Sequence, residues 1–148
     1  MSKREVWSWL EKVPDPEIPV LTIVDLGIVR DVTVGDTVSV DIAPTYSGCP
    51  ATEVIETSVR SALVENGVEN PVVRRVLSPP WTTDWITEEG RRKLHEYGIA
   101  PPQKSTHIAC PQCDSLNTEK VSEFGSTACK AAWRCLDCLE PFEYFKCL

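Results

Sequence analysis

The chain has 148 residues, of which 42% are hydrophobic, and a formal net charge of −7 at pH 7. This length allows one compact domain plus a mini-domain, and no apolar run approaches the roughly 20 residues needed to cross a bilayer. Both parts of the chain are acidic, which disfavours a nucleic-acid-binding function, because neutralising phosphates requires a basic face. We therefore expect a protein partner, with no nucleic acid and no membrane.

The N-terminal segment does not resemble a secretory signal. Residues 1–12 have neither an apolar core nor a small-residue cleavage site, so we expect a cytoplasmic protein. In that reducing compartment, the seven cysteines are more consistent with metal ligands or reactive thiols than with disulfides.

The first elements are expected to be a helix and a hairpin. Ser2 and Glu5 suit a capping box at the start of a helix over about residues 2–12. Alternating apolar residues then predict strands over 28–34 and 37–43, joined by a two-residue primed turn.

A second helix, a third strand and a short third helix are expected next. Pro50 suits the first position of a helix that ends at Gly67. A strand follows over residues 72–77, and Thr87 caps a helix that ends before Gly98.

This order of elements predicts an α+β fold. We expect residues 1–99 to form a two-layer sandwich, a small sheet with helices on one face. Residues 100–106 read as a linker, and residues 105–148 as a zinc-ribbon mini-domain with strands around 131–134 and 142–145.

Two C-x2-C pairs in the tail form the strongest motif. Cys110, Cys113, Cys135 and Cys138 have the spacing of paired metal-binding knuckles, and four thiolates suit a closed, structural Zn²⁺ site. An iron–sulfur cluster on the same four thiols is the alternative. Metal binding would supply folding energy that such a short tail lacks.

Three further residues could take part in thiol or metal chemistry. Cys129 and Cys147 lie outside the knuckles, where they are either buried thiols or a substitute or second thiol site. His107 precedes the first knuckle and is either a surface residue or a ligand.

Cys49 is a candidate reactive thiol. It directly precedes Pro50, at the start of the second predicted helix, where unpaired N–H groups and the helix dipole stabilise a thiolate. Glu53 in the first turn would oppose that effect. The alternative is a cysteine that serves only as a small apolar cap.

Three acidic residues crowd the proline-rich loop before the hairpin. Asp15, Glu17 and Asp25 could form a site, although turn residues in such a loop need no chemistry. The sequence has no nucleophile–histidine–carboxylate set, no P-loop and no Gly-rich dinucleotide fingerprint, so we expect no enzyme of the common classes.

Several long stretches resemble a known family. The segments DPEIPVLTIVDLGIV, TYSGCP and PPWTTDW resemble the metal–sulfur (iron–sulfur) cluster assembly factors, which include SufT and the cytosolic iron–sulfur targeting proteins. The tail segments CPQC, FGSTACKA and EPFEYFKC are similar to the extension of the PaaD-like phenylacetate-degradation proteins.

The resemblance implies a function in maturation of a metal centre. PaaD-like proteins are associated with the multicomponent phenylacetyl-CoA epoxidase, whose reductase component carries a [2Fe–2S] cluster. The implied function is to mature or maintain that cluster or the oxygenase's metal centre, with the reductase as client. Cys49, Asp15, Glu17 and Asp25 match the family's loop positions and would hold transient iron or a cluster. Since one thiol is a weak ligand set, a homodimer or the client would complete it. The alternative is a stable accessory subunit of the oxygenase complex.

Overall fold

The structure, a computed structural model, describes the whole chain except residues 45–50, 104–106, 128 and 147–148. Its contacts divide the chain into two compact units, Met1–Gly90 and Arg91–Leu148. This division falls ahead of the linker that composition predicts. The boundaries of separately folding domains at residues 1–99 and 105–148 stay a prediction.

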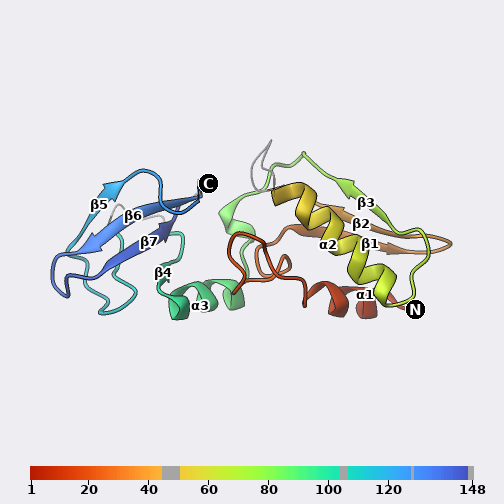
Figure 1. Cartoon of the computed structure of the whole chain (residues 1–148), viewed down its shortest axis with the longest axis horizontal. Coiled ribbons are helices and arrows are strands. Elements are labelled where there is room, and N and C mark those ends of the chain that lie inside the picture. The colour runs from red at the N-terminus through yellow and green to blue at the C-terminus, as the bar shows by residue number, and fades with distance from the viewer. Residues whose placement is uncertain (45–50, 104–106, 128, 147–148) are drawn as a thin grey trace. The chain divides into compact units, whose positions relative to one another are not determined.

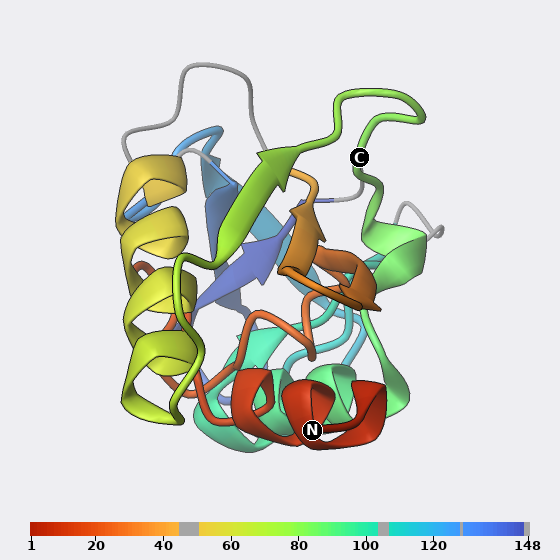
Figure 2. The same ribbon diagram turned by 90° about the vertical axis from the view of Figure 1, so that its right-hand side faces the viewer.

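The first unit combines a small mixed sheet with helices (Figure 1). Its elements are α1 (Lys3–Leu10), β1 (Val29–Val34), β2 (Val38–Ile42), α2 (Ala51–Glu65), β3 (Val72–Arg75) and the 3₁₀ helix η1 (Thr83–Trp85). The strand order is β1-β2-β3, with β1 and β2 antiparallel and β2 and β3 parallel. The helix α1 packs on β1 and α2, and α2 packs on β3, as Figure 2 shows from a second side. The expected two-layer α+β architecture is confirmed.

The hairpin follows the predicted alternation, but its turn differs. Val38, Val40 and Ile42 are buried on one face of β2, and Val38 pairs with Val34. That register leaves Gly35–Thr37 to close the hairpin, with the Gly35 N–H donating to Thr37 O. The predicted two-residue primed turn at Gly35-Asp36 is therefore wrong, because burial of the valines fixes a register with three residues left over.

Two predicted boundaries are too long. The Ser2 hydroxyl accepts the N–H of Glu5 at 3.2 Å, as a helix cap should, but α1 ends at Leu10 rather than near residue 12. Similarly, β3 ends at Arg75, and Leu77 is 67% exposed. Local apolar pattern extends past both ends, but those residues do not join the regular hydrogen bonding.

The second unit contains a four-stranded sheet of order β4-β7-β6-β5. Most of α3 (Glu88–Tyr97) belongs to it, with β4 (Ile99–Ala100), β5 (Thr118–Ser122), β6 (Lys130–Cys135) and β7 (Pro141–Phe145). β5, β6 and β7 are antiparallel neighbours, whereas β4 pairs with β7 in parallel.

The start of the predicted linker belongs to this sheet. Ala100 is fully buried in β4, and Gln103 exchanges two hydrogen bonds with the Tyr144 hydroxyl. The core of the unit consists of Ala100, Ile108, Cys110, Cys135, Phe142 and Tyr144, with Trp133 packed against it. Composition alone therefore mistook a packed segment for a linker.

Candidate functional site

The four knuckle cysteines converge in space. The Sγ atoms of Cys110, Cys113, Cys135 and Cys138 all lie within 4.8 Å of one another. The Cys110–Cys138 and Cys113–Cys135 sulfurs are 3.7 and 3.6 Å apart. A tetrahedral metal with bonds of about 2.3 Å to sulfur would separate its ligands by about 3.8 Å. The cluster fits a metal of this kind with no rearrangement.

Backbone hydrogen bonds shape both knuckles in the same way. The N–H of Gln112 donates to the Cys110 sulfur, and the N–H of Cys138 donates to the Cys135 sulfur, each at 3.4 Å. Such bonds stabilise a thiolate and orient its lone pairs. The first cysteine of each pair is buried, which fixes the cluster to the core of the unit.

The ionisation of these thiols shows that the cluster needs a cation. The N–H groups of Cys138 and then Asp137 lower the pKa of Cys135 to about 7, against the effect of burial. The N–H of Glu140 also lowers the pKa of Cys138, but burial and the neighbouring thiols outweigh it and raise that pKa to about 12. The thiols therefore cannot all ionise at neutral pH unless a positive ion compensates their charge.

The other candidate residues of the tail lie outside the cluster. Cys129 is buried, with the Thr127 hydroxyl 2.9 Å from its sulfur, and His107 is exposed. Neither belongs to the group of converging ligand atoms. Cys147 lies outside the described residues.

The acidic loop of the first unit is held by its own carboxylates. Asp15 is 7% exposed and accepts the N–H groups of Glu17 and Ile18, at 3.0 and 2.8 Å. Asp25 is 8% exposed; its carboxylate accepts the N–H of Thr22, and its own N–H donates to the Thr22 hydroxyl. Both carboxylates stabilise turns, whereas Glu17 is exposed to solvent.

The three acids do not form a converging ligand set. Within residues 1–44, 51–103, 107–127 and 129–146, only the cysteine cluster brings together three or more side chains that could hold a metal. A site function for Asp15, Glu17 and Asp25 would require further ligands, and it stays a prediction.

The structure packs two of the motif segments against each other. The Trp81 indole N–H donates to the Leu26 carbonyl at 2.8 Å, and the Arg30 guanidinium lies 3.6 Å from the centre of the Trp85 ring. Gly27 lies so close to Trp85 that a Cβ would be 2.4 Å from its carbonyl oxygen. The sequence analysis identified both segments but missed this contact; the glycine in an apolar segment was the available signal.

Cys49 lies outside the described residues, but its flanks are described. The N–H of Ala43, at the end of β2, donates to Ile28 O at 2.8 Å, and α2 begins at Ala51. The cysteine therefore belongs to the connection between a paired strand and the N-terminus of a helix.

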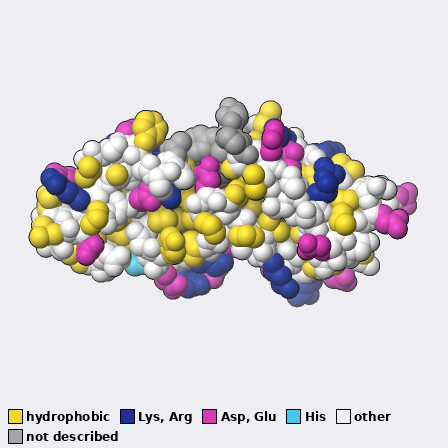
Figure 3. All heavy atoms as spheres, viewed as in Figure 1, with side chains coloured by type: hydrophobic (Ala, Val, Ile, Leu, Met, Phe, Trp, Pro, Cys, Tyr) yellow, Lys and Arg dark blue, Asp and Glu magenta, His cyan; other side chains and the backbone are white. Residues whose placement is uncertain are grey.

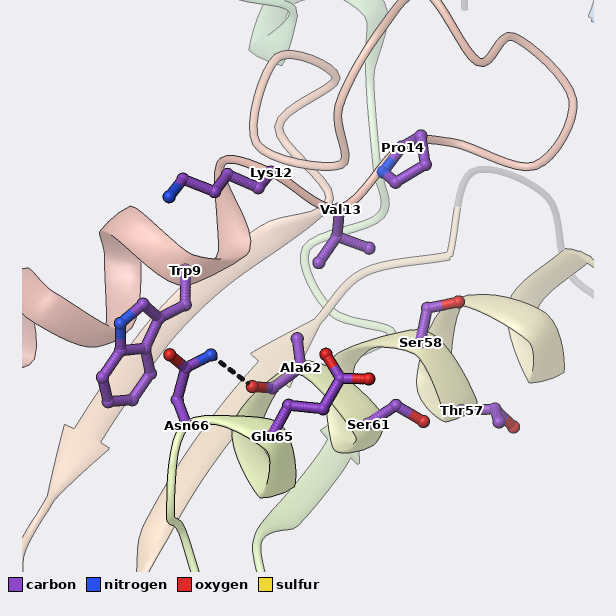
Figure 4. A pocket seen from close by; sticks show the side chains of 10 residues that line it. All are labelled: Trp9, Lys12, Val13, Pro14, Thr57, Ser58, Ser61, Ala62, Glu65 and Asn66. Carbon is purple, nitrogen blue, oxygen red and sulfur yellow. Dashed lines mark hydrogen bonds between the residues drawn. The ribbon is translucent and has the colours of Figure 1, made fainter.

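A groove between α1 and α2 does not coincide with the predicted site (Figure 4). Its volume is about 410 Å³, and its lining includes Trp9 and Lys12 with the hydroxyl side chains Thr57, Ser58 and Ser61. None of the predicted acidic residues lines it.

Comparisons with known proteins assign the chain to a family. The family model described as iron-sulfur cluster assembly protein matches residues 3–77, and the one described as PaaD zinc beta ribbon domain matches residues 96–146. A protein of Escherichia coli (strain K12), provisionally named as a subunit of 1,2-phenylacetyl-CoA epoxidase, is 52% identical over 152 residues, which is 97% of this chain and 92% of that protein. The chain is a PaaD-like member of the iron–sulfur cluster assembly protein family. The resemblance that its motifs carry is confirmed.

Solved structures support the fold of this PaaD-like chain. A domain of unknown function, DUF59, from Bacillus anthracis is 30% identical with a TM-score of 0.58, and covers 62% of this chain and 90% of its own. A conserved hypothetical protein from Thermotoga maritima is 32% identical with a TM-score of 0.54, and covers 64% and 94%. With the ribbon match and the four-cysteine cluster, the second unit is a metal-binding ribbon. No helix among the described residues is long and apolar enough to span a membrane.

Proposed function

We propose that this protein is a non-catalytic maturation factor for an iron–sulfur or other metal centre of the multicomponent phenylacetyl-CoA epoxidase. The observation that carries the proposal is the match over nearly the whole chain to a protein named as a subunit of that epoxidase, together with the cluster assembly family of residues 3–77. The client is the [2Fe–2S] reductase component. The protein acts in the cytoplasm, on a protein partner rather than on nucleic acid or a membrane.

The cysteine cluster is a structural centre in this proposal, and the metal is Zn²⁺. Cys110, Cys113, Cys135 and Cys138 would hold it, and the ion would supply folding energy to the small ribbon. All four sulfurs converge on one closed site, so none remains for cargo. Elemental analysis of anaerobically purified protein tests this: zinc near one per chain without visible absorption agrees, and a brown protein with charge-transfer bands contradicts it.

Cys49 is the cargo thiol. It precedes the first helical residue described, Ala51, so the unpaired N–H groups of that helix end favour its thiolate. One thiolate is an incomplete ligand set for iron or a cluster, so a second copy or the client supplies the rest. Asp15, Glu17 and Asp25 complete the site, the two buried carboxylates by fixing the loop and Glu17 by facing solvent.

Substitution of Cys49 tests the cargo function. The full chain with Cys49→Ala is co-expressed with the epoxidase reductase, and the iron per purified reductase chain is measured, with Ser47→Ala as the neighbouring control. The reductase should lose iron only with Cys49→Ala, while the zinc content and the unfolding midpoint of the variant stay unchanged. Unchanged reductase iron would contradict the proposal.

A stable accessory subunit is the second candidate, favoured by the relative's name as a subunit. The two differ in persistence. An accessory subunit stays in stoichiometric amount with the purified, iron-loaded oxygenase complex, whereas a maturation factor leaves it.

A further inference from the structure

Three leucines at the cysteine end of the second unit lie in solvent. Leu116, Leu136 and Leu139, which form the knuckle patch, are 60%, 42% and 77% exposed. Hydrogen bonds fix their backbones together: the Leu136 N–H donates to Asn117 O at 2.8 Å, and the Asn117 amide donates to the Asp137 carboxylate at 3.1 Å. Figure 3 shows hydrophobic side chains at the surface of this unit among charged ones. The patch therefore combines a fixed backbone with apolar side chains that face solvent.

The backbone of Leu139 makes this exposure costly. Leu139 directly follows the second knuckle with φ 65°, and Asp114 directly follows the first with φ 61°. Aspartate tolerates this left-handed conformation, but leucine does not, and glycine would be preferred. Leu139 neither packs in the core nor suits its backbone. Folding therefore does not explain this residue, whereas a contact outside the chain does.

Carboxylates surround the knuckle patch. Asp114, Asp137 and Glu140 accompany the leucines, and residues 107–118 and 135–145 contain no lysine or arginine. Hydrogen bonds from Ser115 and then Asn117 lower the pKa of Asp137, so it is charged at neutral pH. The imidazole of His95 lies beside the first of these acids, with Nε2 3.6 Å from Asp114 Oδ1.

We propose that the knuckle patch docks a basic amphipathic segment of a partner protein. Apolar side chains of that segment cover the three leucines, and its lysines or arginines face the carboxylates. A second copy of this chain does not fit, because a two-fold contact would bring the same carboxylates together. The inference deepens the proposed function, on which it rests only for the existence of a client.

A peptide-binding measurement tests this surface. The probe is a fluorescent peptide of two Leu-Lys-Lys-Leu-Leu-Lys-Leu repeats, titrated with the metal-loaded full chain, and the matched probe has glutamate in place of lysine. In the chain, Leu139→Gly and Leu116→Ser remove the patch. Val64→Ser, at a 55% exposed position of α2, is the control.

The lysine peptide should bind, and each patch variant should weaken it about tenfold, the effect of losing one buried apolar contact. The control and the glutamate peptide should show no such change and no binding, respectively. The unfolding midpoint of Leu139→Gly should be unchanged or higher, because glycine relaxes the backbone. A lower midpoint would show that Leu139 serves the fold.

Three results would overturn the proposal: no binding of the lysine peptide, equal binding by the patch variants, or equal binding of the glutamate peptide. Cys49→Ala should bind the lysine peptide like the wild type. Loss of client iron transfer with intact peptide binding therefore concerns the cargo function alone.

Discussion

Replacing Gly27 by alanine puts a methyl group where Trp85 already lies. Gly27 has φ +71°, and its Cβ would be 2.4 Å from the Trp85 carbonyl oxygen and 2.7 Å from the Trp85 Cβ. A left-handed backbone costs an alanine about 1–2 kcal/mol. Forcing a methyl group into occupied space costs about 1–3 kcal/mol more. We therefore expect Gly27→Ala to lower the free energy of unfolding by about 3 kcal/mol, within the sum of these ranges.

Two other glycines separate the two causes. Gly67 has φ +91° with nothing within 4 Å of a Cβ, so Gly67→Ala should cost only the backbone part, about 1–2 kcal/mol. Gly35 has neither a positive φ nor a neighbour within 4 Å, so Gly35→Ala should cost almost nothing.

Urea unfolding followed by tryptophan fluorescence measures the series. With a slope of about 1.5 kcal/mol per molar urea, Gly27→Ala should lower the midpoint by about 2 M. The shift for Gly67→Ala should be about half as large. Equal shifts for Gly27→Ala and Gly67→Ala would refute the packing of Trp85 on Gly27.

Three further predictions concern the metal, one ion pair and one buried hydrogen bond. Chelation of the metal, or Cys113→Ser, should abolish amide protection in the ribbon strands and leave that of β1 and β2 unchanged, as hydrogen exchange would show. Lys3 donates to Asp31 and lowers the pKa of its carboxyl, so this contribution to stability is present above the ordinary value and is lost as pH falls through the lowered one; Lys3→Ala should raise the pKa of Asp31 in an NMR titration. Trp81→Phe leaves the Leu26 carbonyl unpaired and should lower the unfolding free energy by about 1–3 kcal/mol, measured in urea.

The sequence predicted those features that depend on local pattern. The alternation of Val38, Val40 and Ile42 indicates a half-buried strand, and the two C-x2-C pairs indicate a thiol cluster, because spacing alone nearly determines both. Similarly, Thr87 begins α3 as expected, with its hydroxyl 3.0 Å from the Gly90 N–H.

The missed features depend on partners far away in the chain. β5 has mostly exposed side chains, so its sequence shows no alternation, and it is a strand only because it pairs with β6. β4 exists through pairing with β7, more than 40 residues later. The packing of Trp85 on Gly27 is likewise a long-range contact, which no local pattern reports.

The crossover between β2 and β3 has a consequence for engineering the first unit. The connection that carries Cys49 is anchored outside itself: Ala43 bonds to Ile28 before it, and Val76 bonds to Ile42 after the crossover. Lengthening a six-residue loop by two residues adds only about 0.3 kcal/mol of closure entropy. The reactive segment can therefore be lengthened or exchanged between relatives as a cassette, while the scaffold that holds its ends retains its register.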